Sequence, residues 1–115
     1  MFEQRRYKRR HLLFYLDVFE QETGRKLGSL GDLTPKGLLI LSERGWLPGE
    51  KLAMEVALPD IDGFRNERLF ARGTVKWTAS DHNPAIQCTG VEFDDLGMKG
   101  QALVSLLVQL IGFRD

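Results

Sequence analysis

Two short segments hold the residues that are best suited to chemistry in this chain. Between positions 5 and 11 lie five cationic side chains and a histidine: Arg5, Arg6, Lys8, Arg9, Arg10 and His11. A guanidinium can grip a phosphate through two parallel hydrogen bonds and can stack on a flat ring, which lysine cannot do. The segment therefore indicates either a solvated basic arm or a group of phosphate contacts.

The second segment is DLTPKG at residues 32–37, which leads into the apolar run LLILS. Asp32 and Thr34 offer oxygen acceptors at a turn that Pro35 favours. Gly37 permits either a positive φ or a ligand close to the backbone. Asp and Thr also bond their own backbone in ordinary turns, so the hexapeptide alone predicts a turn and leaves open whether it holds a ligand.

Other candidates for catalysis or metal binding are weak. His11, His82 and the single cysteine, Cys88, are not spaced as ligands of one metal ion, and no GxSxG, P-loop or HExxH motif occurs. The acidic pairs at 60/62 and 94/95 fall in expected loops and strand ends, where solvated carboxylates are usual. We therefore expect no catalytic residue, no metal site and no enzymatic activity.

Composition limits the class of protein and its partners. With 115 residues the chain has the size of one domain, long enough to bury about 65% of the surface of its unfolded form. Sixteen Lys and Arg balance sixteen Asp and Glu, which disfavours a nucleic-acid polymer or an anionic membrane as partner. Apolar stretches are far shorter than the ~20 residues of a membrane span, the N-terminus is charged where a signal peptide is apolar, and a lone cysteine fits a reducing compartment. We expect a cytoplasmic protein.

The segment after the arm has the pattern of an antiparallel β protein. Apolar residues recur at period two, and Thr23-Gly24 and Pro48-Gly49 mark turns. Strands are expected over residues 12–20, 26–33, 37–43, 51–59, 67–78 and 85–95. About six strands at roughly ten-residue spacing predict a small barrel or sandwich.

Three details of this pattern make specific predictions about the strands. The nearly continuous apolar run GLLILSE at 37–43 predicts a strand that is covered on both faces. Period two places Trp77 on the same face as Leu69 and Val75. Gly90 is expected at a bulge or at a close backbone approach.

Residues 98–113 change to the helical period. Their apolar positions follow the spacing of one helical face: Leu103, Leu106, Leu107, Leu110 and Ile111. Val104 and Val108 widen this stripe beyond one packing surface. Packing on the barrel is the favoured explanation, and a homodimer through this helix stays open.

The arginine arm and the turn together resemble the PilZ domain family, bacterial receptors for cyclic di-GMP. The family's RxxxR motif is met twice, by Arg5–Arg9 and by Arg6–Arg10, and its [DN]-x-S-x-x-G motif is met by residues 32–37 with Thr34 in place of serine. The hairpin at 18–34, GLLILSE, VKW at 75–77 and TGVEF at 89–93 follow in the family's order over nearly the whole chain.

The resemblance implies a mainly β fold: a six-stranded antiparallel, split-barrel-like PilZ β-barrel with a C-terminal α-helix. It divides the single domain, 1–115, into a flexible arm at 1–11, a barrel at 12–95 and a helix at 98–113. The expected ligand is cyclic di-GMP, bound by Arg5, Arg6, Arg9, Arg10, Asp32, Thr34 and Gly37.

The two arginine pairs that match RxxxR are expected to have different roles in ligand binding. Parity with the inward-facing Leu16 favours Arg5 and Arg9 as the motif, with Arg6 and Arg10 as supporting phosphate contacts. Closure of the arm over the ligand would change the surface that is shown to an unknown effector protein. By analogy with the family, that effector belongs to motility, exopolysaccharide synthesis or biofilm formation.

Two other functions stay open. One is a PilZ-fold adaptor for protein interaction that does not bind cyclic di-GMP. The other is an RNA-binding small barrel that uses the arm with Tyr7 and Phe14, which the neutral net charge disfavours.

Overall fold

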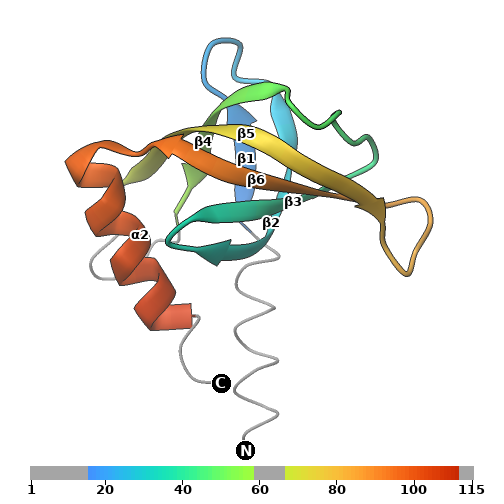
Figure 1. Ribbon diagram of the computed structural model, residues 1–115. Coiled ribbons are helices and arrows are strands. Elements are labelled where there is room, and N and C mark those ends of the chain that lie inside the picture. The colour runs from blue at the N-terminus through green and yellow to red at the C-terminus, as the bar shows by residue number, and fades with distance from the viewer. Residues whose placement is uncertain (1–15, 59–66, 112–115) are drawn as a thin grey trace, which may run out of the picture.

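The computed structural model describes residues 16–58 and 67–111, the side chain of residue 111 excepted (Figure 1). Within them lie six strands and one helix: β1 (Asp17–Glu20), β2 (Lys26–Thr34), β3 (Gly37–Ser42), β4 (Lys51–Ala57), β5 (Arg68–Ser80), β6 (Gln87–Asp95) and α2 (Gly97–Ile111). The expected N-terminal arm, residues 12–15 of the first expected strand and residues 112–113 of the expected helix lie outside the described residues.

The strands close into a barrel in the order β1-β2-β3-β6-β5-β4, and every neighbouring pair is antiparallel. β1 is short, and it closes the barrel by pairing with β2 on one side and β4 on the other. The predicted fold class, a six-stranded antiparallel barrel followed by a helix, is confirmed.

The barrel interior is the core of the molecule. Alternate residues of the strands point inward, and Leu30, Ile40, Met54 and Leu69 are completely buried there. Each such side chain contributes about 1.5–3 kcal/mol relative to its exposed form. α2 lies against the barrel (Figure 1), packs on β2 and β5, and buries Leu107. Among the described residues, no helix has the length and apolarity needed to cross a membrane.

β3 is covered on one face only. Leu38 and Ile40 are buried in the barrel, whereas Leu39 and Leu41 lie half-buried on the outer surface. The prediction of a strand covered on both faces was therefore wrong. A closed barrel has one interior, so the apolar residues on the other face of this strand belong to its outer wall.

A β-bulge in β5 turns Trp77 out of the barrel. Val75 pairs with Val91 and Trp77 pairs with the adjacent Gly90, so Lys76 is an extra residue in the ladder. The extra residue reverses the alternation beyond it, and Trp77 is 48% exposed while Val75 is buried. The prediction that both share one face was wrong, because period two does not reveal a bulge.

Candidate functional site

Four neighbouring strands carry one row of outward-facing residues. Asp32 of β2 pairs with Leu39 of β3, Leu39 pairs with Gly90 of β6, and Gly90 pairs with Trp77 of β5. We call these four residues the outer row. It crosses the wall of the barrel beside the β2–β3 turn, with a carboxylate at one end and an indole at the other.

A cavity of about 330 Å³ opens on the outer row. It is lined by the row itself and by Thr34, Lys36, Gly37, Leu38, Lys76, Val91 and Glu92. The structure thus brings together Asp32, Thr34 and Gly37, the predicted site residues that it describes, and adds an aromatic ring and two ammonium groups.

Asp32 keeps acceptor capacity for a ligand. Its Oδ1 accepts the Leu33 N–H at 2.9 Å, and its side chain is exposed. A carboxylate has about four lone-pair sites, so one short local bond leaves most of them available. The pairing with β3 shifts between Leu30 and Asp32, a bulge just before the carboxylate that directs it to the outer surface.

Thr34 holds the turn. Its hydroxyl oxygen accepts the N–H groups of Lys36 and Gly37, each at 3.2 Å, and the hydroxyl lies 3.4 Å from the Gly37 carbonyl. This is a local side-chain turn of the kind that Ser and Thr form. A contact between Thr34 and a ligand stays a prediction.

Position 37 requires glycine because the backbone of β6 lies too close to it for a Cβ. Its φ is not positive, contrary to one of the two expected reasons. A Cβ at this position would collide with the backbone carbonyl of Val91. The close neighbour is therefore the adjacent strand of the barrel, although the residue also lines the cavity.

Trp77 was not among the site residues predicted from the sequence, which placed it on the face of Leu69 and Val75. Of the two reasons expected for Gly90, the bulge is confirmed, because Gly90 lies opposite the bulge in β5. Its close neighbour is a side chain and not a backbone: the Trp77 indole lies across it, where a Cβ would collide with the ring nitrogen. Gly90 in the facing strand was the one sequence feature that could have indicated an outward-facing Trp77. A half-exposed indole can stack on a nucleic-acid base with about 1–3 kcal/mol.

The lysine side chains that line the cavity are available to a ligand. Lys76 Nζ lies 3.5 Å from Glu92 Oε1, and both side chains are 56% exposed. Such an exposed pair contributes about 0.2–1 kcal/mol, so Lys76 can turn to a ligand anion at little cost. Lys36, exposed on the turn, lines the same cavity.

Solved structures with the same barrel identify the fold. The chain superposes on the inhibitor of motility MotI/DgrA from Bacillus subtilis with a TM-score of 0.66 and 15% identity, over 86% of this chain and 48% of that chain. It superposes on the PilZ domain of YcgR from Escherichia coli, solved with cyclic di-GMP, with a TM-score of 0.60 and 13% identity, over 84% and 80% of the two chains. The chain has the PilZ fold.

The resemblance that the sequence motifs predicted is thus confirmed for the fold. This chain spans about half the length of the MotI/DgrA chain, 48%. No protein-family model matches the sequence, and no curated protein matches it.

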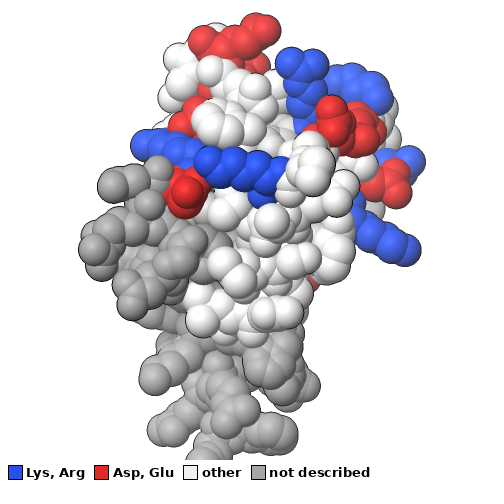
Figure 2. Space-filling view, turned by 90° about the vertical axis from the view of Figure 1, so that its left-hand side faces the viewer, with Lys and Arg blue, Asp and Glu red and all other residues white. Residues whose placement is uncertain are grey.

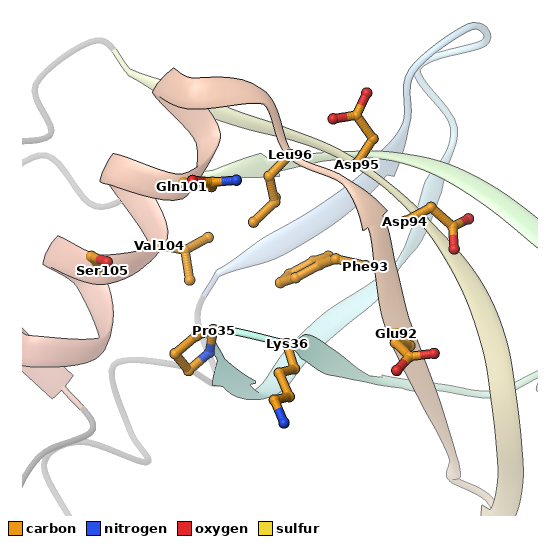
Figure 3. A pocket seen from close by; sticks show the side chains of 10 residues that line it. All are labelled: Pro35, Lys36, Glu92, Phe93, Asp94, Asp95, Leu96, Gln101, Val104 and Ser105. Carbon is orange, nitrogen blue, oxygen red and sulfur yellow. The ribbon is translucent and has the colours of Figure 1, made fainter.

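A second cavity of the PilZ barrel, of about 470 Å³, lies on the other side of the β2–β3 turn. Phe93, Leu96 and Val104 converge on it from β6 and α2, and Pro35 faces them from the turn (Figure 3). The carboxylates of the adjacent strand end project away from this space (Figure 3). Three carboxylates and a single ammonium group are among its lining residues, so it offers less to an anionic nucleotide than the cavity on the outer row, where two ammonium groups balance two carboxylates.

The β2–β3 turn is the wall between the two cavities. Lys36 and Glu92 line both of them. The Lys36 carbonyl accepts the Phe93 N–H at 2.8 Å, which ties the turn to β6. A ligand that moves this turn would therefore also change the cavity beside α2.

The four arginines of the predicted site, Arg5, Arg6, Arg9 and Arg10, lie outside the described residues. The described chain starts at Leu16, whose carbonyl accepts the Leu30 N–H at 2.9 Å. Contacts of the four arginines with a ligand stay predictions.

Proposed function

We propose that this chain is a receptor for cyclic di-GMP and acts as a regulatory adaptor without catalytic activity. One observation carries the proposal: the Asp32 carboxylate, the Trp77 indole and the ammonium groups of two lysines line one cavity on a PilZ barrel. The YcgR PilZ domain, which has the same fold, was solved with this nucleotide.

The chemistry of the cavity suits the parts of the ligand. Cyclic di-GMP has guanine N–H donors, flat purine rings and two anionic phosphates. Asp32 offers acceptors to the guanine edge, and Trp77 offers a surface on which a ring can stack. Lys36 and Lys76 add positive charge for the phosphates.

The dimensions of the outer row suit a base. Asp32 and Trp77 are separated by three strand spacings of about 4.8 Å, which places their backbones about 14 Å apart. The Trp77 indole itself covers Gly90, and the half-buried Leu39 lies between the indole and Asp32. A base that stacks on the indole can therefore direct its edge over Leu39 toward the carboxylate.

The arm can reach this site. Leu16 is bonded to Leu30, and β1 and β2 are antiparallel, so a chain extended backwards from Leu16 heads along β2 toward its turn. Arg10 precedes Leu16 by six residues, and Lys36 follows Leu30 by six residues. Six extended residues span about 20 Å, which is long enough for the arginine segment to reach the turn.

In this mechanism the arm closes over the bound nucleotide. Arg5 and Arg9, in the register assigned to the motif, and the supporting Arg6 and Arg10 clamp phosphates and stack on guanine. The ordering of the arm costs entropy that these charge-assisted bonds must exceed. Closure changes the surface shown to an effector protein, which we place in motility control on the similarity to the inhibitor of motility MotI/DgrA.

Isothermal titration of the full chain with cyclic di-GMP tests the proposal. The wild type is expected to release heat and bind with micromolar or tighter affinity. Arg9→Ala should weaken binding about ten- to hundred-fold, through the loss of a charge-assisted contact of ~1.5–3 kcal/mol. Arg25→Ala, which removes an exposed arginine at the β1–β2 turn, is the matched control and should bind like the wild type.

A second candidate function is a PilZ-fold adaptor that does not bind the nucleotide. It is favoured by the internal use of two motif residues, because Thr34 holds its own turn and Gly37 makes room for β6. The absence of heat at tens of micromolar protein, with circular dichroism showing an intact barrel, would reject the receptor and leave this function.

A further inference from the structure

α2 presents an apolar ridge to solvent. Met98, Ala102, Leu106 and Leu110 follow one another at intervals of four residues and form one row along the helix. Met98 is 88% exposed, Leu106 45% and Leu110 49%, and Ala102 is exposed as well. We call these four residues the α2 ridge. The core needs none of them, because the opposite side of the helix already packs on the barrel.

Among the described residues, the row of α2 beside the ridge carries no charge. The neighbouring row consists of Gln101, Ser105 and Gln109, which are polar, exposed and uncharged. Lys99 is the one charged residue in the sequence of α2, and its Nζ lies 3.0 Å from Glu67 Oε1. Seen from the side of α2, the charged side chains gather in the upper half of the molecule, and the part of the surface below them that the structure describes is white (Figure 2).

These features point to a second copy of this chain as the occupant. A two-fold contact brings a patch against itself, so a charge close to the axis meets its own like charge. The α2 ridge and the row beside it avoid this repulsion. A basic or acidic partner, in contrast, would find no complementary charge there.

The shape of the ridge also fits itself. Rows with a spacing of four residues pack between one another when two helices cross at about −50°, the commonest helix packing. The small Ala102 lies between the larger Met98 and Leu106, which lets the second helix approach closely at the crossing point. The glutamines of the neighbouring row can then hydrogen-bond to those of the other copy. We infer that this protein forms a two-fold homodimer through the α2 ridge, independently of nucleotide binding.

The size of the ridge predicts a weak dimer. A helix of 15 residues is about 22 Å long and about 10 Å wide. Its exposed side falls well short of the ~800 Å² per partner of a standard stable interface. The dimer should therefore dissociate in the micromolar range, where it can respond to protein concentration.

Sedimentation equilibrium of the full chain, from about 10 µM to about 500 µM and without nucleotide, tests this contact. The mass is expected to rise from 13.1 kDa toward twice that value. Leu106→Glu and Ala102→Glu should each raise the dissociation constant at least tenfold, because the charge is doubled across the two-fold axis. Leu47→Glu places the same charge at a residue that is 72% exposed outside the ridge, and it should dimerise like the wild type.

A cysteine pair near the axis gives a second readout that does not require a disruptive change. In a Cys88→Ser background, Ala102→Cys is expected to form an intermolecular disulfide under mild oxidation, while Leu47→Cys is not. A monomer at every concentration, or Leu106→Glu dimerising as the wild type does, overturns the inference. If the wild type is monomeric, the α2 ridge would instead be a binding surface for a different protein.

Discussion

The β1–β2 turn and the β2–β3 turn are both held by hydrogen bonds of a threonine hydroxyl, but the strands beside them differ. At the β1–β2 turn the Thr23 hydroxyl donates to Glu20 at 2.6 Å and accepts the Arg25 N–H at 3.2 Å. At the β2–β3 turn the Thr34 hydroxyl accepts two N–H groups at the same distance of 3.2 Å. A carboxylate shortly before a threonine is thus a way to build a turn, and by itself it does not indicate a ligand.

The strands beside the turns differ in their chemistry. The β1–β2 turn borders a cavity of about 550 Å³ lined by four carboxylates and two cations, with no aromatic ring among its lining residues: Glu20, Glu22, Lys51, Leu52, Ala53, Arg72, Gly73, Asp94 and Asp95. Hydrogen bonds from Thr74 and Lys51 lower the pKa of Asp94, which keeps this carboxylate charged. A dinucleotide with two phosphates would be repelled there. The β2–β3 turn borders the outer row, so the neighbouring strands decide which turn can bind a nucleotide.

Removal of the carboxylate from each turn should separate them most clearly. Asp32→Ala should weaken the binding of cyclic di-GMP about ten- to hundred-fold, because it removes a charged acceptor worth ~1.5–3 kcal/mol. Glu20→Ala, the matched change at the β1–β2 turn, should leave the affinity unchanged. Calorimetric titration of the two variants measures both values, and an equal loss in both would contradict the assignment of the site.

The aromatic ring should be the next largest contributor. Trp77→Ala should weaken binding about tenfold, since base stacking on an aromatic side chain contributes about 1–3 kcal/mol. Phe70→Ala removes another exposed ring of β5, 53% exposed and outside the cavity on the outer row, and serves as the control. Equal affinities of these two variants would show that Trp77 does not contact the ligand.

The two turn glycines should differ in their effect on stability. Gly37→Ala forces a Cβ against the backbone of β6, and overpacking of this kind costs about 2–3 kcal/mol of unfolding free energy. Gly24 has a φ of 74° with open space around it, so Gly24→Ala should cost only about 1 kcal/mol. Urea unfolding of both variants measures the difference, and a milder effect at Gly37 would contradict the close approach of β6.

The smallest effect is expected at the threonine of the β2–β3 turn. Thr34→Ser keeps the hydroxyl and its two bonds to N–H groups and removes only a methyl group beside the cavity. Stability should change by less than about 0.5 kcal/mol, and the affinity for cyclic di-GMP should be equal or higher. A marked loss of affinity in this variant would mean that the methyl group itself contacts the ligand.

The sequence predicted the fold well because the fold depends on patterns that one strand or helix carries alone. Period-two alternation located the strands of the barrel, and the change to the helical period located α2. The motif at residues 32–37 also pointed to the cavity that the structure contains.

The outer row escaped prediction because it depends on register between strands. Trp77 reaches the outer surface through the bulge at Lys76, and the side of β3 that carries Leu39 is set by closure of the barrel. Neither feature can be predicted from the hydrophobic periodicity of a single segment. A site assembled from four strands becomes visible only when their pairing is known.

The most direct test is an amide NMR titration of the full chain with cyclic di-GMP, followed residue by residue. The largest shifts are expected at Asp32, Leu39, Gly90 and the Trp77 indole N–H, while Thr23 and Gly24 stay unchanged. Shifts confined to the β1–β2 turn, or a spectrum that the nucleotide does not alter, would contradict binding at the outer row.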